Sequence, residues 1–188
     1  MNGGAPRVVW LIWPVDPLSV TARSAAQRLN QRGIPAHLVW NPLNGEIVQT
    51  LPATRAACGL TAADRGERIN REGRVCLQIR VLGSVREPFT DGPMAGLDAI
   101  LTWLDSWRVP RRWPAGPPLP HPHSLGCDRS RRLWARGGHF GHSQVPGTDQ
   151  ADPGAIDIRR ITGPQTPVVE VPRPREEVRE PMLLPTPV

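Results

Sequence analysis

Two short apolar runs set the framework that this chain can adopt. Val8 to Trp13 (VVWLIW) is continuously apolar, and Val75 to Leu82 (VCLQIRVL) is apolar except for Gln78 and Arg80. Both runs are rich in β-branched or aromatic residues, and both have the length of a buried strand rather than of a helix. The sequence therefore predicts a sheet that contains these two strands.

Helical periodicity and turn signals occupy the intervals around these runs. Asp16 and Pro17 predict the start of a helix that ends near Gly33, and an apolar stripe predicts a second helix over residues 92–107. The Asn-Gly pair at 44–45 predicts a hairpin between them. A histidine-bearing loop follows the second helix. This order predicts an α/β fold with a mixed central β-sheet flanked by helices.

The length and composition bound the domain organisation. The 188 residues are enough for one domain and a tail, and 23 prolines and 18 glycines imply many loops. After Ile161 the periodicity ends, and proline, glutamate and arginine dominate. We expect one domain over residues 1–161 and a disordered tail over residues 162–188.

Charge and hydropathy exclude several classes of partner. The net charge is +6, but the arginines are scattered without interleaved aromatic residues, so we expect no nucleic-acid partner. Three widely spaced cysteines argue against a disulfide framework.

The sequence also bears on membrane association. The first apolar run ends at Pro14, too early for a signal peptide, and no stretch approaches the about 20 apolar residues of a membrane helix. We expect no membrane partner and a chain that is cytoplasmic as synthesised; extracellular action would need another route.

The strongest candidate site lies between Gly137 and Ile161. His142 lies ten residues before Asp152, and Pro153-Gly154 follows the aspartate directly. A neutral imidazole and a carboxylate are good zinc ligands, and the turn residues allow the chain to bring the two together. His139 is a further possible ligand, with packing inside the loop as the alternative explanation.

This segment resembles the zinc-binding end of the N-acetylmuramoyl-L-alanine amidase family, which includes the phage lysozyme-type amidases and the peptidoglycan recognition proteins. The resemblance rests on the strings G-H-S-x-x-P, which contains His142, and D-P-G, which begins at Asp152. It implies an amidase-like fold over about residues 7–161 and a zinc site that cleaves the bond between N-acetylmuramic acid and L-alanine. Weaker similarities to the family lie at residues 34–49 and 70–83, and residues 92–118 resemble the long helix and connection of actinobacterial members.

Three departures from the family pattern argue against hydrolysis. The family's first zinc ligand is a histidine at the end of the first strand, whereas residues 1–36 contain no histidine. Arg80 occupies the position where the family commonly has a catalytic glutamate, and Gln150 occupies that of an oxyanion-stabilising lysine or histidine. A zinc site needs three protein ligands. His142 and Asp152 would therefore form an incomplete site that retains zinc poorly.

Three functional hypotheses follow. The first is an amidase-fold protein with a degenerate zinc site that binds a peptidoglycan fragment or a protein partner without efficient hydrolysis. The second is an active zinc amidase with a replacement third ligand. The third is a protein-interaction platform that acts through the tail.

Overall fold

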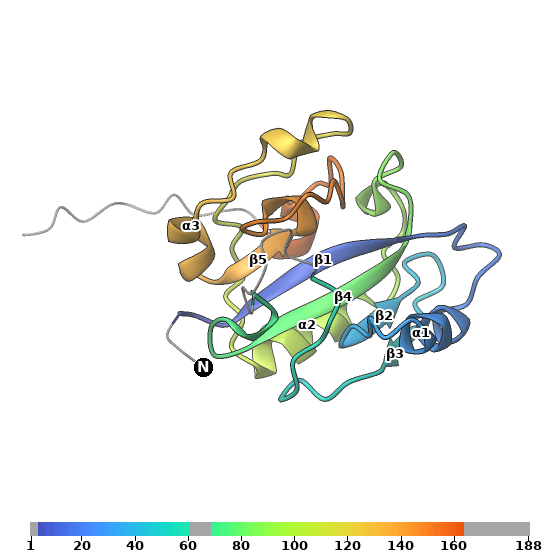
Figure 1. Cartoon of the computed structure of the whole chain (residues 1–188). Coiled ribbons are helices and arrows are strands. Elements are labelled where there is room, and N and C mark those ends of the chain that lie inside the picture. Colours follow the sequence, from blue (N-terminus) through green and yellow to red (C-terminus); the bar gives the residue numbers. More distant parts are fainter. Residues whose placement is uncertain (1–3, 61–68, 164–188) are drawn as a thin grey trace, which may run out of the picture.

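The chain folds as an α/β protein around a five-stranded mixed sheet (Figure 1). The computed structural model describes residues 4–60 and 69–163. The strand order is β3-β2-β4-β1-β5, in which only β3 runs antiparallel to its neighbour. The strands are β1 (Arg7–Pro14), β2 (Leu38–Trp40), β3 (Ile47–Gln49), β4 (Cys76–Gly83) and β5 (Gly138–Gly141). The helices are α1 (Ala22–Gln31), α2 (Leu97–Ser106), α3 (Arg131–Ala135) and α4 (Arg159–Thr162), and short 3₁₀ turns span Ile69–Arg71, Phe89–Asp91, His123–Gly126 and His142–Gln144.

The two predicted apolar strands form the centre of the sheet. β1 and β4 lie side by side and parallel, in register from Arg7 opposite Cys76 to Pro14 opposite Gly83. Strands that are covered on both faces need apolar residues on both sides, as in β1 from Val8 to Trp13. β4 departs from this pattern, because it carries the buried polar residues Gln78 and Arg80 on one face. The expectation of an α/β fold with a mixed sheet is confirmed.

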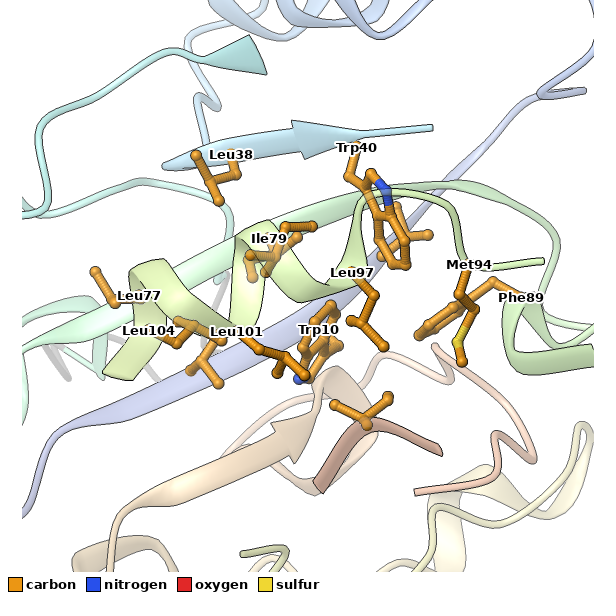
Figure 2. Close-up of a cluster of buried hydrophobic side chains, with 14 of the residues drawn as sticks. Trp10, Leu38, Trp40, Leu77, Ile79, Phe89, Met94, Leu97, Leu101 and Leu104 are labelled. Atoms are coloured by element: carbon orange, nitrogen blue, oxygen red, sulfur yellow. The ribbon is translucent and has the colours of Figure 1, made fainter. Parts of the chain in front are cut away.

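One face of the sheet packs against α2. Val8, Trp10 and Ile12 of β1 point to this face, since alternate residues of a strand share a side. Figure 2 shows the leucines of α2 directed at Trp10 and at the side chains of β4. Trp10 stacks on Phe89, with ring centroids 6.0 Å apart, and meets Trp40 edge-on at 6.2 Å. The buried helix residues are Leu97, Ile100, Leu101 and Leu104.

The opposite face packs against α1 and α3. Three alanines and a leucine of α1 contact the sheet side chains Trp13, Val39 and Leu82. Farther along the sheet, Trp134 of α3 packs on Phe140 with ring centroids 4.9 Å apart. The small alanines let α1 approach the sheet closely, so this face is covered without large helix side chains.

Both long helices start later than the sequence predicted. Asp16 does not cap a helix, because its carboxylate accepts hydrogen bonds from Leu18 N–H and Ser19 Oγ and closes a turn. α1 begins instead after Thr21, whose side chain caps it. α2 begins after Gly96, where a positive φ of 81° breaks the helical backbone.

The histidine-bearing segment, expected to be a loop, forms the edge strand β5. It pairs with β1 from Arg7 opposite Gly138 to Trp10 opposite Gly141. The strand has four residues, two of them glycine, so it carries no apolar run that would identify it in the sequence. Its existence depends on the free edge that β1 offers.

The last described element is α4, which passes the predicted domain boundary at Ile161 by one residue. The tail predicted to be disordered begins at Thr162, and its residues 164–188 lie outside the described part of the chain. Within residues 4–60 and 69–163, the helices are too short or too polar to cross a membrane.

We expect Trp10→Ala to lower the free energy of unfolding by about 3–5 kcal/mol, as is typical when a buried aromatic side chain is removed from a core. Trp10 is fully buried between the sheet and α2. Urea denaturation followed by circular dichroism measures the change. Leu18→Ala is the control, because Leu18 is 84% exposed and its loss should cost less than about 0.5 kcal/mol. Equal losses for the two variants would contradict this view of the core.

Candidate functional site

Gln144 fixes the turn that follows β5. Its side-chain oxygen accepts hydrogen bonds from Gly141 N–H at 2.9 Å and from Trp113 Nε1 at 2.7 Å. Its amide group donates to the carbonyl of Gly116 at 2.7 Å. Pro153 packs against Gly141 so closely that a side chain at Gly141 would lie 2.5 Å from the proline ring. The two halves of the predicted zinc segment are therefore held against each other.

This arrangement brings His142 and Asp152 together, as their spacing predicted. His142 Nδ1 lies 2.9 Å from Asp152 Oδ1, and Ser143 N–H donates to the backbone carbonyl of Asp152 at 2.7 Å. The pair is buried, with 3% of the His142 side chain and 10% of the Asp152 side chain exposed. It lies inside the protein rather than in an open cleft.

The second carboxylate oxygen of Asp152 binds the backbone of β1. β5 ends opposite Trp10, so no strand accompanies β1 on that side at Ile12. Ile12 N–H donates to Asp152 Oδ2 at 2.7 Å, and the Ile12 carbonyl accepts from Arg80 Nη1 at 3.2 Å. Asp152 and Arg80 thus satisfy the backbone groups of Ile12. We call the four residues Ile12, Arg80, His142 and Asp152 the Ile12 clamp.

The charges of the clamp support one another. Burial is the largest influence on the pKa of Asp152 and raises it, but His142, the Ile12 N–H and Arg80 together outweigh burial, so the pKa is lowered. Burial lowers the pKa of Arg80, against the attraction of Asp152. Arg80 also donates to the carbonyl of Gly59 at 3.2 Å. Asp152 is therefore an ionised carboxylate next to a buried cation.

His139 does not join this cluster. It lies on the α2 side of the sheet, where Trp10 Nε1 donates to its Nδ1 at 3.2 Å and the Trp10 ring stacks on it. Trp113 covers it with ring centroids 5.9 Å apart. Burial, followed by repulsion from Arg111, lowers the pKa of His139 to about 3. It is a neutral core histidine, in line with the packing alternative.

Gln150 likewise makes only local hydrogen bonds. Its amide group donates to Asp149 at 2.7 Å, and its backbone N–H donates to Thr148 Oγ1. Arg80 therefore lies in the clamp, while Gln150 has no hydrogen bond to it.

The residues of the clamp do not fit a zinc ion. Two ligands of a tetrahedral zinc lie about 3.3 Å apart, so the His142–Asp152 pair could open around a metal with little movement. However, within residues 4–60 and 69–163, no three His, Cys, Asp or Glu side chains are grouped to hold a metal ion. Ile12 contributes only its backbone to the clamp, and Arg80 would repel a cation.

A separate pocket of about 710 Å³ lies at the carboxyl ends of β1 and β4. Its walls come from the end of β1 and the segment after it, from the β2–β3 hairpin, and from the end of β4 and the segment after it, at residues 14–18, 42–43, 82–84, 87–89 and 91–92. Apolar residues dominate these walls, including Leu18 and Leu43, which are exposed. We call it the strand-end pocket. Ligands of open α/β sheets bind at this edge, so it is the candidate ligand site of the fold.

Comparison with known proteins adds no assignment. No protein-family model matches the chain, and no curated protein matches it.

Sequence reasoning missed the roles of Ile12 and of the strand-end pocket. Ile12 takes part through its backbone N–H, and a motif defined by side chains does not reveal backbone contacts. The pocket had a usable signal, because Asp16 and Glu87 come just after the two apolar strands. The carboxyl ends of neighbouring parallel strands meet at one edge of a sheet, and that rule would have placed these residues together.

We expect Asp152→Asn to destabilise the fold by about 3–5 kcal/mol, because it leaves the buried charge of Arg80 without its counter-ion. Chemical denaturation at neutral pH measures the loss. Asp149→Asn is the matched control, since Asp149 is an exposed carboxylate three residues away, and it should cost less than about 0.5 kcal/mol. A stable Asp152→Asn protein would show that the clamp does not hold the fold together.

His139 should make stability depend on pH. Its folded pKa of about 3 lies below the unfolded value, so the unfolded chain takes up a proton that the folded chain does not. This contribution is complete above about pH 6.5 and is lost as the pH falls towards the folded pKa. Between pH 7.5 and 4.5, the parent should lose about 2–3 kcal/mol more than His139→Asn, which keeps an acceptor for Trp10. The pKa of His37 is also lowered by burial, so the variant retains part of the slope. Identical pH profiles from urea titrations would contradict this role of His139.

Proposed function

We propose that this chain is a non-catalytic binding protein with an amidase-like fold, whose ligand is peptidoglycan-like cell-wall material. The observation that carries the proposal is the state of Asp152. Both of its oxygens are engaged within the protein, one by His142 and one by the Ile12 N–H. A carboxylate used in this way supports the backbone of β1, and it is poorly available to a metal or a substrate.

The absence of catalytic groups from the clamp supports the same proposal. Hydrolysis of an amide needs an activated water and a group that stabilises the developing oxyanion. In the clamp, the carboxylate that the family pattern expects on β4 is replaced by Arg80, whose guanidinium is occupied by the carbonyls of Ile12 and Gly59. His142 is buried, with 3% of its side chain exposed, and a substrate has no access to it.

The strand-end pocket supports binding. It is large enough for part of a peptide or a sugar, and it is distinct from the clamp, since none of its lining residues is a clamp residue. The two regions nevertheless touch. A side chain at Gly154 would lie 2.3 Å from the carbonyl of Val85, in the segment after β4 that forms one wall of the pocket. The segment that carries Asp152 therefore packs against the segment after β4, which contributes to the pocket wall.

We expect the purified protein to contain far less than one zinc per chain and to sediment with purified cell walls without lysing them. Two metal ligands cannot retain zinc as a complete set does. Metal analysis of protein purified without chelator, a wall-turbidity assay and co-sedimentation measure the three properties.

The controls separate the other hypotheses. Stoichiometric zinc together with lysis that His142→Ala abolishes would establish an active amidase and overturn the proposal. Protein that neither holds zinc nor sediments with walls would exclude a cell-wall ligand and would favour a protein partner. The His142→Ala variant must be checked for folding by circular dichroism, because His142 belongs to the clamp.

A further inference from the structure

The charge of the strand-end pocket differs from that of the whole chain. The protein has a net charge of +6 and 23 basic residues, yet no arginine or histidine is among the residues that line this pocket. Three carboxylates line it instead, those of Asp16, Glu87 and Asp91. An apolar cavity with acidic residues only is complementary to a ligand that has an apolar body and a cationic group.

Two of these carboxylates are free to bind a ligand. Glu87 and Asp91 are exposed, and neither side chain has a hydrogen bond or an ion pair within residues 4–60 and 69–163. The third, Asp16, accepts hydrogen bonds from Ser19 Oγ and Leu18 N–H, which lower its pKa. It is therefore an anion at neutral pH and adds to the negative potential of the pocket.

No cationic side chain is part of the pocket lining. Arg160 donates from its Nη1 to the carbonyls of Thr90 and Gly92, so hydrogen bonds to the backbone hold its guanidinium beside the pocket. Arg86 is exposed and is not among the lining residues. The negative charge of Glu87 and Asp91 therefore remains available at the mouth of an apolar cavity, where a ligand cation is only partly screened by water.

We propose that the strand-end pocket selects peptides that carry a free side-chain amine. This inference rests on the proposed function, and within it the ligand is a peptidoglycan stem peptide whose diamino acid has an unmodified amine. The apolar walls hold the aliphatic part of the peptide, and Glu87 and Asp91 bind the ammonium group. Acetylation of that amine removes its positive charge and with it the attraction to the two carboxylates.

The test uses two soluble fragments that differ in one group. The first is a disaccharide-tetrapeptide with lysine as its third residue, and the second is the same fragment with the lysine amine acetylated. Titration calorimetry of the full chain should show about tenfold tighter binding of the free amine, as expected for two partly exposed charge contacts. The preference should shrink as salt is raised.

Matched variants test whether Glu87 and Asp91 cause the preference for the free amine. Glu87→Gln and Asp91→Asn should each reduce it by about two- to fivefold, and the double variant should abolish it. Asp98→Asn removes an exposed carboxylate of α2 that does not line the pocket, and it should leave the preference unchanged. All substituted residues are exposed, so circular dichroism should show intact folds.

The outcomes distinguish this inference from the proposed function. If both fragments bind with the same affinity to the parent and to the double variant, selection by charge is wrong while the cell-wall ligand stands. If neither fragment binds, the proposed function itself fails, and the inference fails with it. If the preference survives in the double variant but not in Asp98→Asn, the amine binds elsewhere and the pocket assignment is wrong.

Discussion

The structure depends on how the free edge of β1 is satisfied. β1 is the buried centre of the fold, but β5 pairs with it only as far as Trp10, and the backbone beyond that point needs other partners. An unpaired backbone group inside a protein costs about 1–3 kcal/mol. Asp152 and Arg80 supply those partners by binding the N–H and the carbonyl of Ile12. One side-chain pair therefore joins β1, β4 and the segment that follows β5.

The clamp holds the candidate zinc segment together through this chain's own side chains. In a zinc site the cation would hold the histidine and the carboxylate together. Here His142 and Asp152 bind each other directly, and the positive charge next to the carboxylate comes from Arg80. An apolar core in place of such buried charges is often as stable or more stable. Unlike apolar contacts, the hydrogen bonds of these charged groups have a fixed direction, and they therefore determine which loop packs against which strand.

The sequence predicted the parts of the fold that depend on local patterns. The two central strands, the hairpin and the presence of both long helices follow from apolar runs, periodicity and an Asn-Gly turn, and the structure confirms them. The helix starts could not be predicted from Asp16 or from the stripe of α2. The carboxylate of Asp16 closes a local turn in place of a helix cap, and the left-handed Gly96 packs against Gly45 of the hairpin.

The candidate site divides in a similar way. The proximity of His142 and Asp152 could be predicted from their spacing and the turn residues around them, and it is observed. The separate location of His139 could not, because it depends on which side of an unforeseen strand the residue occupies. The role of Asp152 was also hidden, since its second partner is a backbone N–H far away in the sequence. Spacing predicts which residues meet, but the partners that a sheet edge leaves unsatisfied decide what those residues do. In this chain the edge of β1 takes up the carboxylate that a metal would need, so a motif that resembles a zinc site is used to hold two strands and a loop in place.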